Sequence, residues 1–414
     1  MKFFSILCLS LVLLFTVPAM GQSSKATQKM TEAEMRAFAD KLAHKYVIVD
    51  GHVDLPYRLR IKNFKVERQY VGITMHYPQG DFDYERAVKG GLTAPFMSIY
   101  VPSSYQLLPD KGKAVADSMI NMVAGIVKNI PDKFALANSV ADVEKNFKAG
   151  KISLPMGMEN GSPVGDDLRG LTYFYDRGIR YITLTHSKNN QICDSSGDTT
   201  KAWNGLSPFG KEVVAEMNRL GMMIDISHVD DNTFYQVMKL SKAPCIASHS
   251  SARFFAPTVK RDMTDDMIKK LGENGGVMCI NFYTAFLSND VALRNKEVGT
   301  LLRSKGLKSE DAGAQTLIEA YTNAHPIPKT DAETVANHID HVVKLAGIDH
   351  VGFGSDYDGV DGPANLPNNL KDVSQYPNLI YELLKRGYTE SDIQKICSGN
   401  FLRVWKKVET VAGK

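Results

Sequence analysis

The chain has 414 residues, with 49 Lys and Arg against 46 Asp and Glu, and so a formal net charge of +3. This small, evenly spread charge argues against nucleic acid or an anionic membrane as the partner and leaves small molecules as the expected ligands. The length is large for one average domain but ordinary for a barrel with insertions, since such barrels run from about 200 to over 400 residues.

The first 21 residues have the pattern of a secretory signal. Lys2 precedes the apolar run FFSILCLSLVLLFTV, and small residues follow at Ala19 and Gly21. A membrane-spanning helix needs about 20 apolar residues, and this run is shorter. We therefore expect cleavage near Gly21, export to the periplasm or the medium, and a single mature domain over residues 22–414 with no integral membrane segment.

Eight short segments rich in Val, Ile, Met and Phe have the pattern of strands, and most are separated by segments with helical spacing. They cover residues 47–50, 93–101, 152–158, 180–185, 222–227, 244–248, 276–281 and 350–355. This alternation predicts a (β/α)8 barrel, in which functional residues collect at the carboxyl ends of the strands.

Two of the intervening helices carry start signals. Phe234 and Val237 have helical spacing after residues 230–232, an Asp-Asp-Asn cluster that can cap a first turn. Thr330 and Glu333 have capping-box spacing ahead of an apolar stripe that leads to the eighth strand. Both signals support the alternation of strands and helices.

Residues 285–330, between the seventh and eighth strands, form a polar insertion with partly helical spacing. A solvated helical decoration is the simplest interpretation. The alternative is a lid over the site or a contact within a homodimer, because long segments between barrel strands often carry function.

A His and an Asp stand two residues apart in VDGHVDLP, residues 49–56, at the end of the first predicted strand. Strand alternation would point His52 and Asp54 to the same face. Imidazole nitrogen with carboxylate oxygen suits Zn²⁺ or a similar divalent ion, and such a pair needs a few more ligands from neighbouring strands. An isolated H-x-D pair is weak evidence for a metal site. Its interpretation depends on whether the other predicted strands also end in potential ligands.

Further His and acidic residues stand at the same end of later strands. They are Glu159, His186, His228, His249 and Asp356, with His350 at a strand border but less well placed. A satisfied core histidine would explain any one of these positions. It does not explain the whole set, which predicts a metal-binding active site at one mouth of the barrel.

Four cysteines follow the signal segment, at positions 193, 245, 279 and 397. Cys245 and Cys279 lie inside predicted core strands, so buried free thiols are expected there even in an exported chain. Cys193 follows His186 in a loop, but no pattern of His or Asp activates it as a nucleophile.

Nine stretches recur together in chain order: DGHVDLP, GMENGSP, YITLTHSKNN, IDISHV, ASHSSAR, VKRDMTD, NFY, HIDHVVKLAGIDHVGFGSDYDG and GNFLRV. They span nearly all of the mature chain, and the set resembles the membrane dipeptidase (renal dipeptidase-like) family of zinc peptidases. That family's fold is an amidohydrolase-type barrel with two zinc ions at its mouth. Residues 189–208 resemble the bacterial branch, and Tyr57 stands where the vertebrate enzymes carry a larger aromatic residue.

Carried over position by position, the resemblance implies two zinc sites. His52 and Asp54 would bind one ion, His228 and His249 would bind the other, and Glu159 would bridge both. A bridging carboxylate keeps two cations close, and a water between them loses its proton to give hydroxide near neutral pH.

The resemblance also implies roles for residues around the metals. Asp356 would take the proton of the water and pass it to the leaving nitrogen. Asp358, beside Gly359 in a predicted turn, is the competing candidate. His186 would contact the substrate and stabilise the tetrahedral oxyanion.

Substrate contacts are implied in the same way. Arg261 would hold the terminal carboxylate of the substrate, which its planar fork suits, with Arg253 as the alternative. Tyr283 would line the substrate pocket or else pack in the core. His338 and His341, three residues apart in a predicted helix, are interpreted as structural or surface groups.

The sequence therefore predicts an exported zinc-dependent dipeptidase that cleaves the amide bond of free dipeptides with a metal-bridging hydroxide, and the resemblance implies tolerance of a C-terminal D-residue. Another metal-dependent amidohydrolase, such as an N-acyl-D-amino acid deacylase or a lactonase, would share the metals and differ in the pocket. A non-catalytic solute-binding protein is the third alternative. The presence of Asp356 beside the five candidate ligands argues against this alternative. A structural zinc needs no proton shuttle and favours a closed shell of four ligands.

Overall fold

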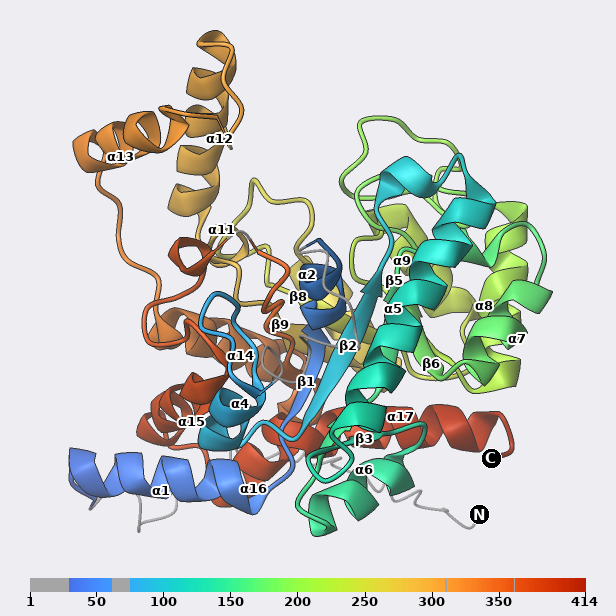
Figure 1. Cartoon of the computed structure of the whole chain (residues 1–414), viewed down its shortest axis with the longest axis horizontal. Coiled ribbons are helices and arrows are strands. Elements are labelled where there is room, and N and C mark those ends of the chain that lie inside the picture. Colours follow the sequence, from blue (N-terminus) through green and yellow to red (C-terminus); the bar gives the residue numbers. More distant parts are fainter. Residues whose placement is uncertain (1–29, 62–74, 310, 361) are drawn as a thin grey trace, which may run out of the picture.

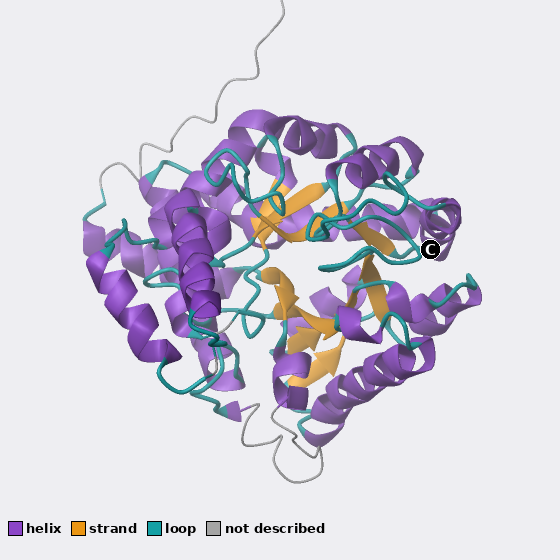
Figure 2. Cartoon of the chain, turned by 90° about the horizontal axis from the view of Figure 1, so that it is seen from above, coloured by secondary structure: helices purple, strands orange, loops and turns teal. Residues whose placement is uncertain are grey.

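The computed structural model describes residues 30–61, 75–309, 311–360 and 362–414. Eight parallel strands close into a barrel in the order β1-β10-β9-β8-β7-β6-β5-β2. Their bounds are β1 Val49–Val53, β2 Ala94–Tyr100, β5 Met156–Glu159, β6 Ile179–Thr183, β7 Met223–Asp225, β8 Ile246–Ser250, β9 Val277–Ile280 and β10 Val351–Phe353. Figure 2 shows these strands inside a ring of helices, which confirms the predicted (β/α)8 barrel.

Helices follow the barrel strands and cover their outer faces (Figure 1). The main helices are α1 Glu32–Lys45, α2 Leu55–Ile61, α4 Tyr84–Gly90, α5 Pro109–Asn129, α6 Val140–Lys148, α7 Arg169–Asp176, α8 Pro208–Leu220, α9 Asp231–Leu240, α10 Asp265–Glu273, α14 Ala332–Ala346, α15 Tyr376–Lys385, α16 Glu390–Gln394 and α17 Asn400–Val411. Within the described residues, no helix is long and apolar enough to cross a membrane. The predicted signal segment, residues 1–21, lies outside the described residues and stays a prediction.

The prediction of one continuous strand over residues 152–158 is wrong, because the structure has two strands there. Residues Ile152–Leu154 form β4, which pairs with β3 (Phe134–Leu136) in a separate two-stranded sheet, and only β5 joins the barrel. Pro155 separates the two strands, because a proline has no N–H to donate to a sheet. Its carbonyl still accepts a hydrogen bond from the N–H of Met97 in β2, at 2.8 Å.

The two helix start signals differ in their outcome. Asp230 caps α9 by accepting a hydrogen bond from the N–H of Thr233, as the sequence predicts. The capping box of α14 lies one residue later than predicted. It joins Asp331 to Thr334, because an Asp side chain caps a helix at least as well as Thr330 would.

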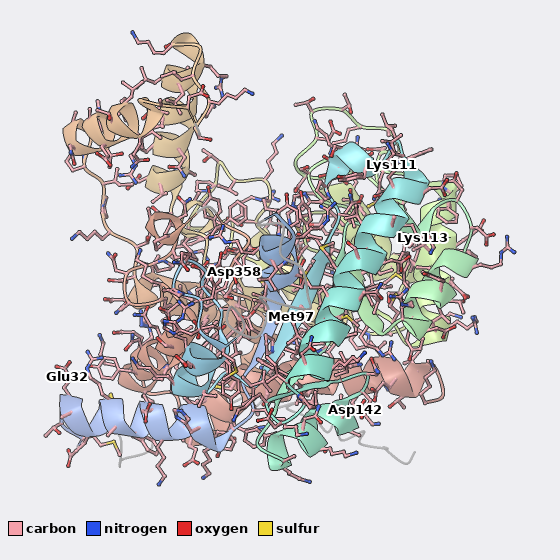
Figure 3. All side chains as sticks on the ribbon, viewed as in Figure 1. Glu32, Met97, Lys111, Lys113, Asp142 and Asp358 are labelled. Atoms are coloured by element: carbon pink, nitrogen blue, oxygen red, sulfur yellow. The ribbon has the colours of Figure 1, made fainter. Side chains whose placement is uncertain are left out.

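Aromatic side chains close the amino-terminal end of the barrel. Phe96 of β2 packs against Tyr181 of β6, with ring centroids 5.3 Å apart, and against Phe401 and Trp405 of α17, at 4.9 and 5.2 Å. Figure 3 shows the side chains that fill the molecule around the strands, with buried Met97 among them. This packing leaves the carboxyl ends of the strands as the open mouth.

The insertion between β9 and β10 is helical, as predicted. It contains α11 (Thr284–Leu287), α12 (Asn289–Ser304) and α13 (Ala314–Ala324). Helices α12 and α13 protrude beyond the barrel in Figure 1. A role of this insertion as a lid or a dimer contact stays a prediction.

Candidate active site

The structure brings the five predicted metal ligands together at the mouth of the barrel. His52 belongs to β1, Glu159 ends β5 and His249 belongs to β8, while Asp54 and His228 come directly after β1 and close after β7. All five side chains are buried or nearly so. Parallel strands end at one mouth, so residues far apart in sequence become neighbours.

Glu159 lies at the centre of this group. Its Oε2 is 3.4 Å from Nε2 of His52, whereas its Oε1 is 3.0 Å from Nε2 of His228 and 3.3 Å from Nε2 of His249. Burial opposes ionisation of Glu159, but the surrounding histidines hold the pKa of its carboxyl well below the usual value. The two carboxylate oxygens therefore face two different sets of nitrogen donors.

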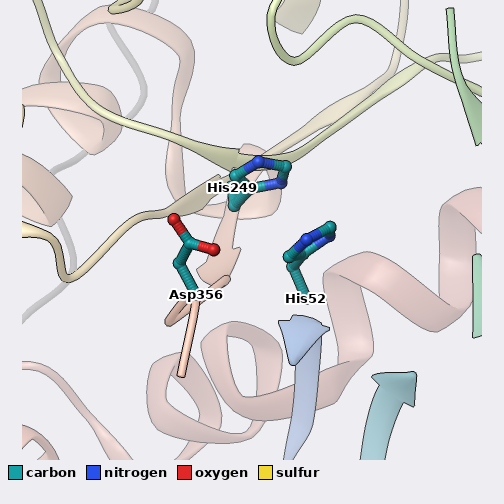
Figure 4. Close-up of side chains that lie close together, drawn as sticks. All are labelled: His52, His249 and Asp356. Carbon is teal, nitrogen blue, oxygen red and sulfur yellow. The ribbon is translucent and has the colours of Figure 1, made fainter. Parts of the chain in front are cut away.

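Asp356 faces the same group from the end of β10. Figure 4 shows its carboxylate beside the rings of His52 and His249. Asn281 donates a hydrogen bond from Nδ2 to its Oδ2 at 3.0 Å. Desolvation raises the pKa of Asp356, and the nearby charges of Asp54 and Glu159 raise it further.

Asp358, the competing proton shuttle, points elsewhere. Its Oδ1 accepts the N–H of Asp81 at 2.8 Å, and Asp81 in return accepts the N–H of Asp358 at 2.9 Å. Burial and the charge of Asp81 raise the pKa of Asp358 to about 7. Asp358 accepts and donates hydrogen bonds with Asp81 and does not line the cavity, whereas Asp356 does. The geometry therefore favours Asp356 as the candidate for proton transfer.

Unusual backbone conformations gather at this mouth. Among the described residues, six that are not glycine have positive φ, and four of them are Asn160, His228, Asp356 and Asp358. Such conformations cost energy and concentrate at functional sites. Gly359 completes the turn, since a Cβ there would lie 2.4 Å from Oδ2 of Asp54 and 2.5 Å from Oδ1 of Asp356.

A cavity of about 290 Å³ opens over these carboxylates and histidines. Its lining includes Tyr57 and Tyr100, packed edge to face at 4.9 Å, and Tyr283 and Phe286, packed in the same way at 4.9 Å. The volume is near the lower end of the usual range for small-molecule sites, about 300 to 1,000 Å³. The cavity thus suits a small substrate with some apolar surface.

His186 lies where the sequence predicts, in the cavity wall. Its Nε2 is 3.6 Å from Oε1 of Glu159, and its ring centroid is 4.7 Å from that of Tyr100. Burial lowers the pKa of His186, so the imidazole is held in its neutral form. A neutral imidazole has one ring N–H group, which can donate a hydrogen bond in the cavity.

Arg261 stands beside the cavity but does not line it. Its guanidinium donates to the carbonyl of His249 at 2.6 Å and to Oγ of Ser250 at 2.7 Å, and it lies 5.6 Å from the ring centroid of Phe286. Its buried Nε has no hydrogen-bond partner among the described residues. Arg253, the alternative, is occupied by a bidentate ion pair with Asp231.

Comparison with known proteins decides the family. Residues 36–414 match the family described as membrane dipeptidase, peptidase family M19. The chain belongs to the M19 membrane dipeptidase family. Among curated proteins, the dipeptidase aclJ of Aspergillus oryzae is 34% identical over 344 residues, which cover 80% of this chain and 71% of that protein.

Solved structures give the same result. The probable dipeptidase PvdM from Pseudomonas aeruginosa is 27% identical with a TM-score of 0.77, over 92% of this chain and 100% of that one. A metallopeptidase from Rhodobacter sphaeroides, liganded with a phosphinate mimic of the dipeptide L-Ala-D-Ala, is 25% identical with a TM-score of 0.71, over 88% and 99%. The predicted resemblance is confirmed, and the chain is a metal-dependent dipeptidase.

The donor groups of this M19 member fit a metal ion. Nε2 of His52 and Oδ1 of Asp54 are buried without a hydrogen-bond partner among the described residues. Unpaired buried polar atoms are costly, and a cation between them would satisfy both. Imidazole nitrogens with carboxylate oxygens are the ligands that zinc and similar ions prefer.

The sequence analysis did not identify Ser248 and Asp225, which form a hydrogen-bonded chain to the predicted ligand His249. Ser248 donates its hydroxyl hydrogen to Asp225 at 2.6 Å, so its oxygen accepts the Nδ1 hydrogen of His249 at 2.8 Å. This leaves Nε2 of His249 unprotonated toward Glu159. The sequence does contain one signal, because Asp225 is an acidic residue inside the apolar segment MMIDIS. Burying a carboxylate costs free energy unless hydrogen-bond donors surround it.

Two further histidines, His338 and His341, have partners outside the group of candidate ligands. Buried His338 accepts the N–H of Ala252 at Nδ1 and donates from Nε2 to the carbonyl of Leu287, both at 3.1 Å, and burial lowers its pKa to about 4. His341 pairs with Asp265 at 2.7 Å. All four cysteines in the described residues are buried free thiols, so the prediction for Cys245 and Cys279 is confirmed.

Proposed function

We propose that this M19 dipeptidase hydrolyses the amide bond of free dipeptides, including those with a C-terminal D-residue, at a site that holds two zinc ions bridged by Glu159. The observation that carries the proposal is the division of donors around Glu159. Oε2 of Glu159 faces His52, whose Nε2 lies 3.2 Å from Oδ2 of Asp54. Oε1 of Glu159 faces His228 and His249. Two donor sets on opposite oxygens of one carboxylate support two ions rather than one.

When bound, the zinc ions would lower the pKa of a shared water, so that hydroxide is available near neutral pH, and would polarise the substrate carbonyl. Asp356 would accept the proton of that water, because its carboxylate faces the cavity and its raised pKa favours the protonated form. It would then deliver the proton to the leaving nitrogen. His186 would donate a hydrogen bond to the oxygen that becomes negative as the carbonyl is attacked.

The cavity and its edge support a small substrate. A volume of about 290 Å³, lined by two pairs of aromatic side chains, suits a molecule the size of a dipeptide. Arg261 would bind the free carboxylate at the edge of the cavity, because its buried Nε has no hydrogen-bond partner among the described residues and its guanidinium lies 5.6 Å from the ring centroid of the cavity residue Phe286. The Rhodobacter sphaeroides structure, which holds a mimic of L-Ala-D-Ala, supports tolerance of a D-residue at the C-terminal position.

A substrate panel tests this function against the other amidohydrolase activities. The zinc-loaded protein is assayed with L,L, L,D and D,D dipeptides, N-acyl-D-amino acids and lactones, and release of the free amino acid or hydroxy acid is measured. We expect L,L and L,D dipeptides to have the highest kcat/KM. Faster turnover of N-acyl-D-amino acids or lactones than of any dipeptide would contradict the proposal.

A further inference from the structure

Tyr181 of β6 reaches across the interior of the barrel toward the metal ligands. Its side chain is fully buried. The ring fits because Gly157, on the neighbouring strand β5, has no side chain, and a Cβ at that position would lie 2.0 Å from Cζ of Tyr181. The glycine therefore makes room for this tyrosine next to β1.

The hydroxyl of Tyr181 contacts β1 at two points. It donates a hydrogen bond to the carbonyl of Gly51 at 3.0 Å, and its oxygen lies 2.9 Å from Nδ1 of His52. A phenol has a single hydrogen to donate, so its contact with His52 is one in which Nδ1–H donates and the phenol oxygen accepts. The hydrogen of the His52 ring is then on Nδ1, and Nε2 carries a lone pair.

That lone pair is on the side of the proposed metal site. Nε2 of His52 lies 3.2 Å from Oδ2 of Asp54 and 3.4 Å from Oε2 of Glu159. Without the phenol oxygen, a buried Nδ1–H would have no acceptor, and the hydrogen would be more stable on Nε2 facing the carboxylates. A histidine in that tautomer cannot bind a metal through Nε2 until it loses the hydrogen.

We propose that Tyr181 is a positioning residue that holds His52 in the tautomer and ring orientation required for metal binding, an inference that rests on the proposed metal site. His249 has a comparable partner in the hydroxyl of Ser248, which is tied to Asp225. Tyr181 is the hydrogen-bond partner of His52 Nδ1 within the part of the chain that the structure describes. Its loss should therefore act on one metal position more than on the other.

Metal titration of the Tyr181→Phe variant tests this role. The substitution keeps the ring that fills the space above Gly157 and removes only the hydroxyl. Metal-free protein is titrated with Zn²⁺ against a chromophoric chelator, and with Co²⁺ while the visible absorption bands are recorded. We expect one of the two zinc equivalents to bind about 10- to 100-fold more weakly, as is usual when the outer partner of a ligating histidine is removed, and the Co²⁺ bands of that site to change.

Tyr357→Phe is the matched control. Tyr357 is also fully buried, and its hydroxyl donates to a backbone carbonyl, that of Leu370, at 3.0 Å. This variant should bind both equivalents as the parent does, and thermal unfolding of the two metal-free variants should show similar losses of stability. Parental zinc affinity in Tyr181→Phe, or equal weakening in both variants, would overturn the inference and leave the proposed function intact. Failure of the parent protein to bind zinc would overturn both.

Discussion

Replacing Asp356 with Asn is expected to lower kcat by about 100-fold or more while the protein keeps its metal. The amide oxygen of the new side chain can still accept the hydrogen bond from Asn281, which Asp356 accepts at 3.0 Å, so the turn after β10 should be preserved. An amide cannot take up the proton of the attacking water, and the step that Asp356 is proposed to serve is lost. The measurements are kcat on a dipeptide and zinc content by mass spectrometry of the same sample.

Asp358→Asn is the control for this experiment. Its new amide oxygen can still accept the N–H of Asp81, which Asp358 holds at 2.8 Å, and the residue does not line the cavity. Its kcat should remain close to that of the parent. Because Asp356 also lies within ligand distance of His52 and His249, a metal-binding role is the competing explanation. Loss of zinc in proportion to kcat in the Asp356 variant would establish that role and refute proton transfer.

Replacing Arg261 with Met should weaken recognition of the substrate carboxylate by about 2 to 5 kcal/mol, as expected for one partner of a desolvated charge pair. This corresponds to a fall in kcat/KM of about 30-fold to several thousand-fold. Methionine is long and unbranched, so it occupies much of the same space beside Phe286. Zinc content should be unchanged, because the guanidinium contacts the carbonyl of His249 and not its ring.

Dipeptide amides distinguish carboxylate binding from a general disturbance of the site. They lack the terminal carboxylate, so they should be poor substrates of the parent and should be affected much less by the Arg261 substitution. Arg253→Met is the matched control, since Arg253 is paired with Asp231 and should not influence the ratio of the two substrates. Equal turnover of dipeptides and their amides by the parent enzyme would show that no carboxylate is recognised.

The barrel and the set of candidate ligands could be predicted because both follow from local patterns. Apolar segments of strand length alternate with helical spacing, and a parallel barrel places every strand end at one mouth. Any His or acidic residue at or next to the carboxyl end of a strand, such as Glu159 or His249, is therefore brought to the same mouth by the topology. Family resemblance then supplied the roles of these residues, which geometry alone leaves open.

Features that depend on contacts between distant strands could not be predicted. Tyr181 is 129 positions from His52, and its hydroxyl is recognised as a partner only when the folded barrel places the two together. Gly157 looks like an ordinary glycine and Gly359 indicates only a turn, until the side chains that occupy the space beside them are known. The break at Pro155 was readable in principle, because proline interrupts a strand, but the apolar residues on both sides favoured one continuous element.

Titration of the metal-free enzyme with zinc tests the two-metal dipeptidase most directly. Protein stripped with a chelator is given increasing amounts of Zn²⁺, and hydrolysis of an L,D dipeptide is measured at each addition. We predict little activity in the stripped protein, full activity only when about two equivalents are bound, and renewed loss on chelation, because Glu159 is expected to place both ions at the attacking water. Full activity with a single tightly bound equivalent would contradict the account.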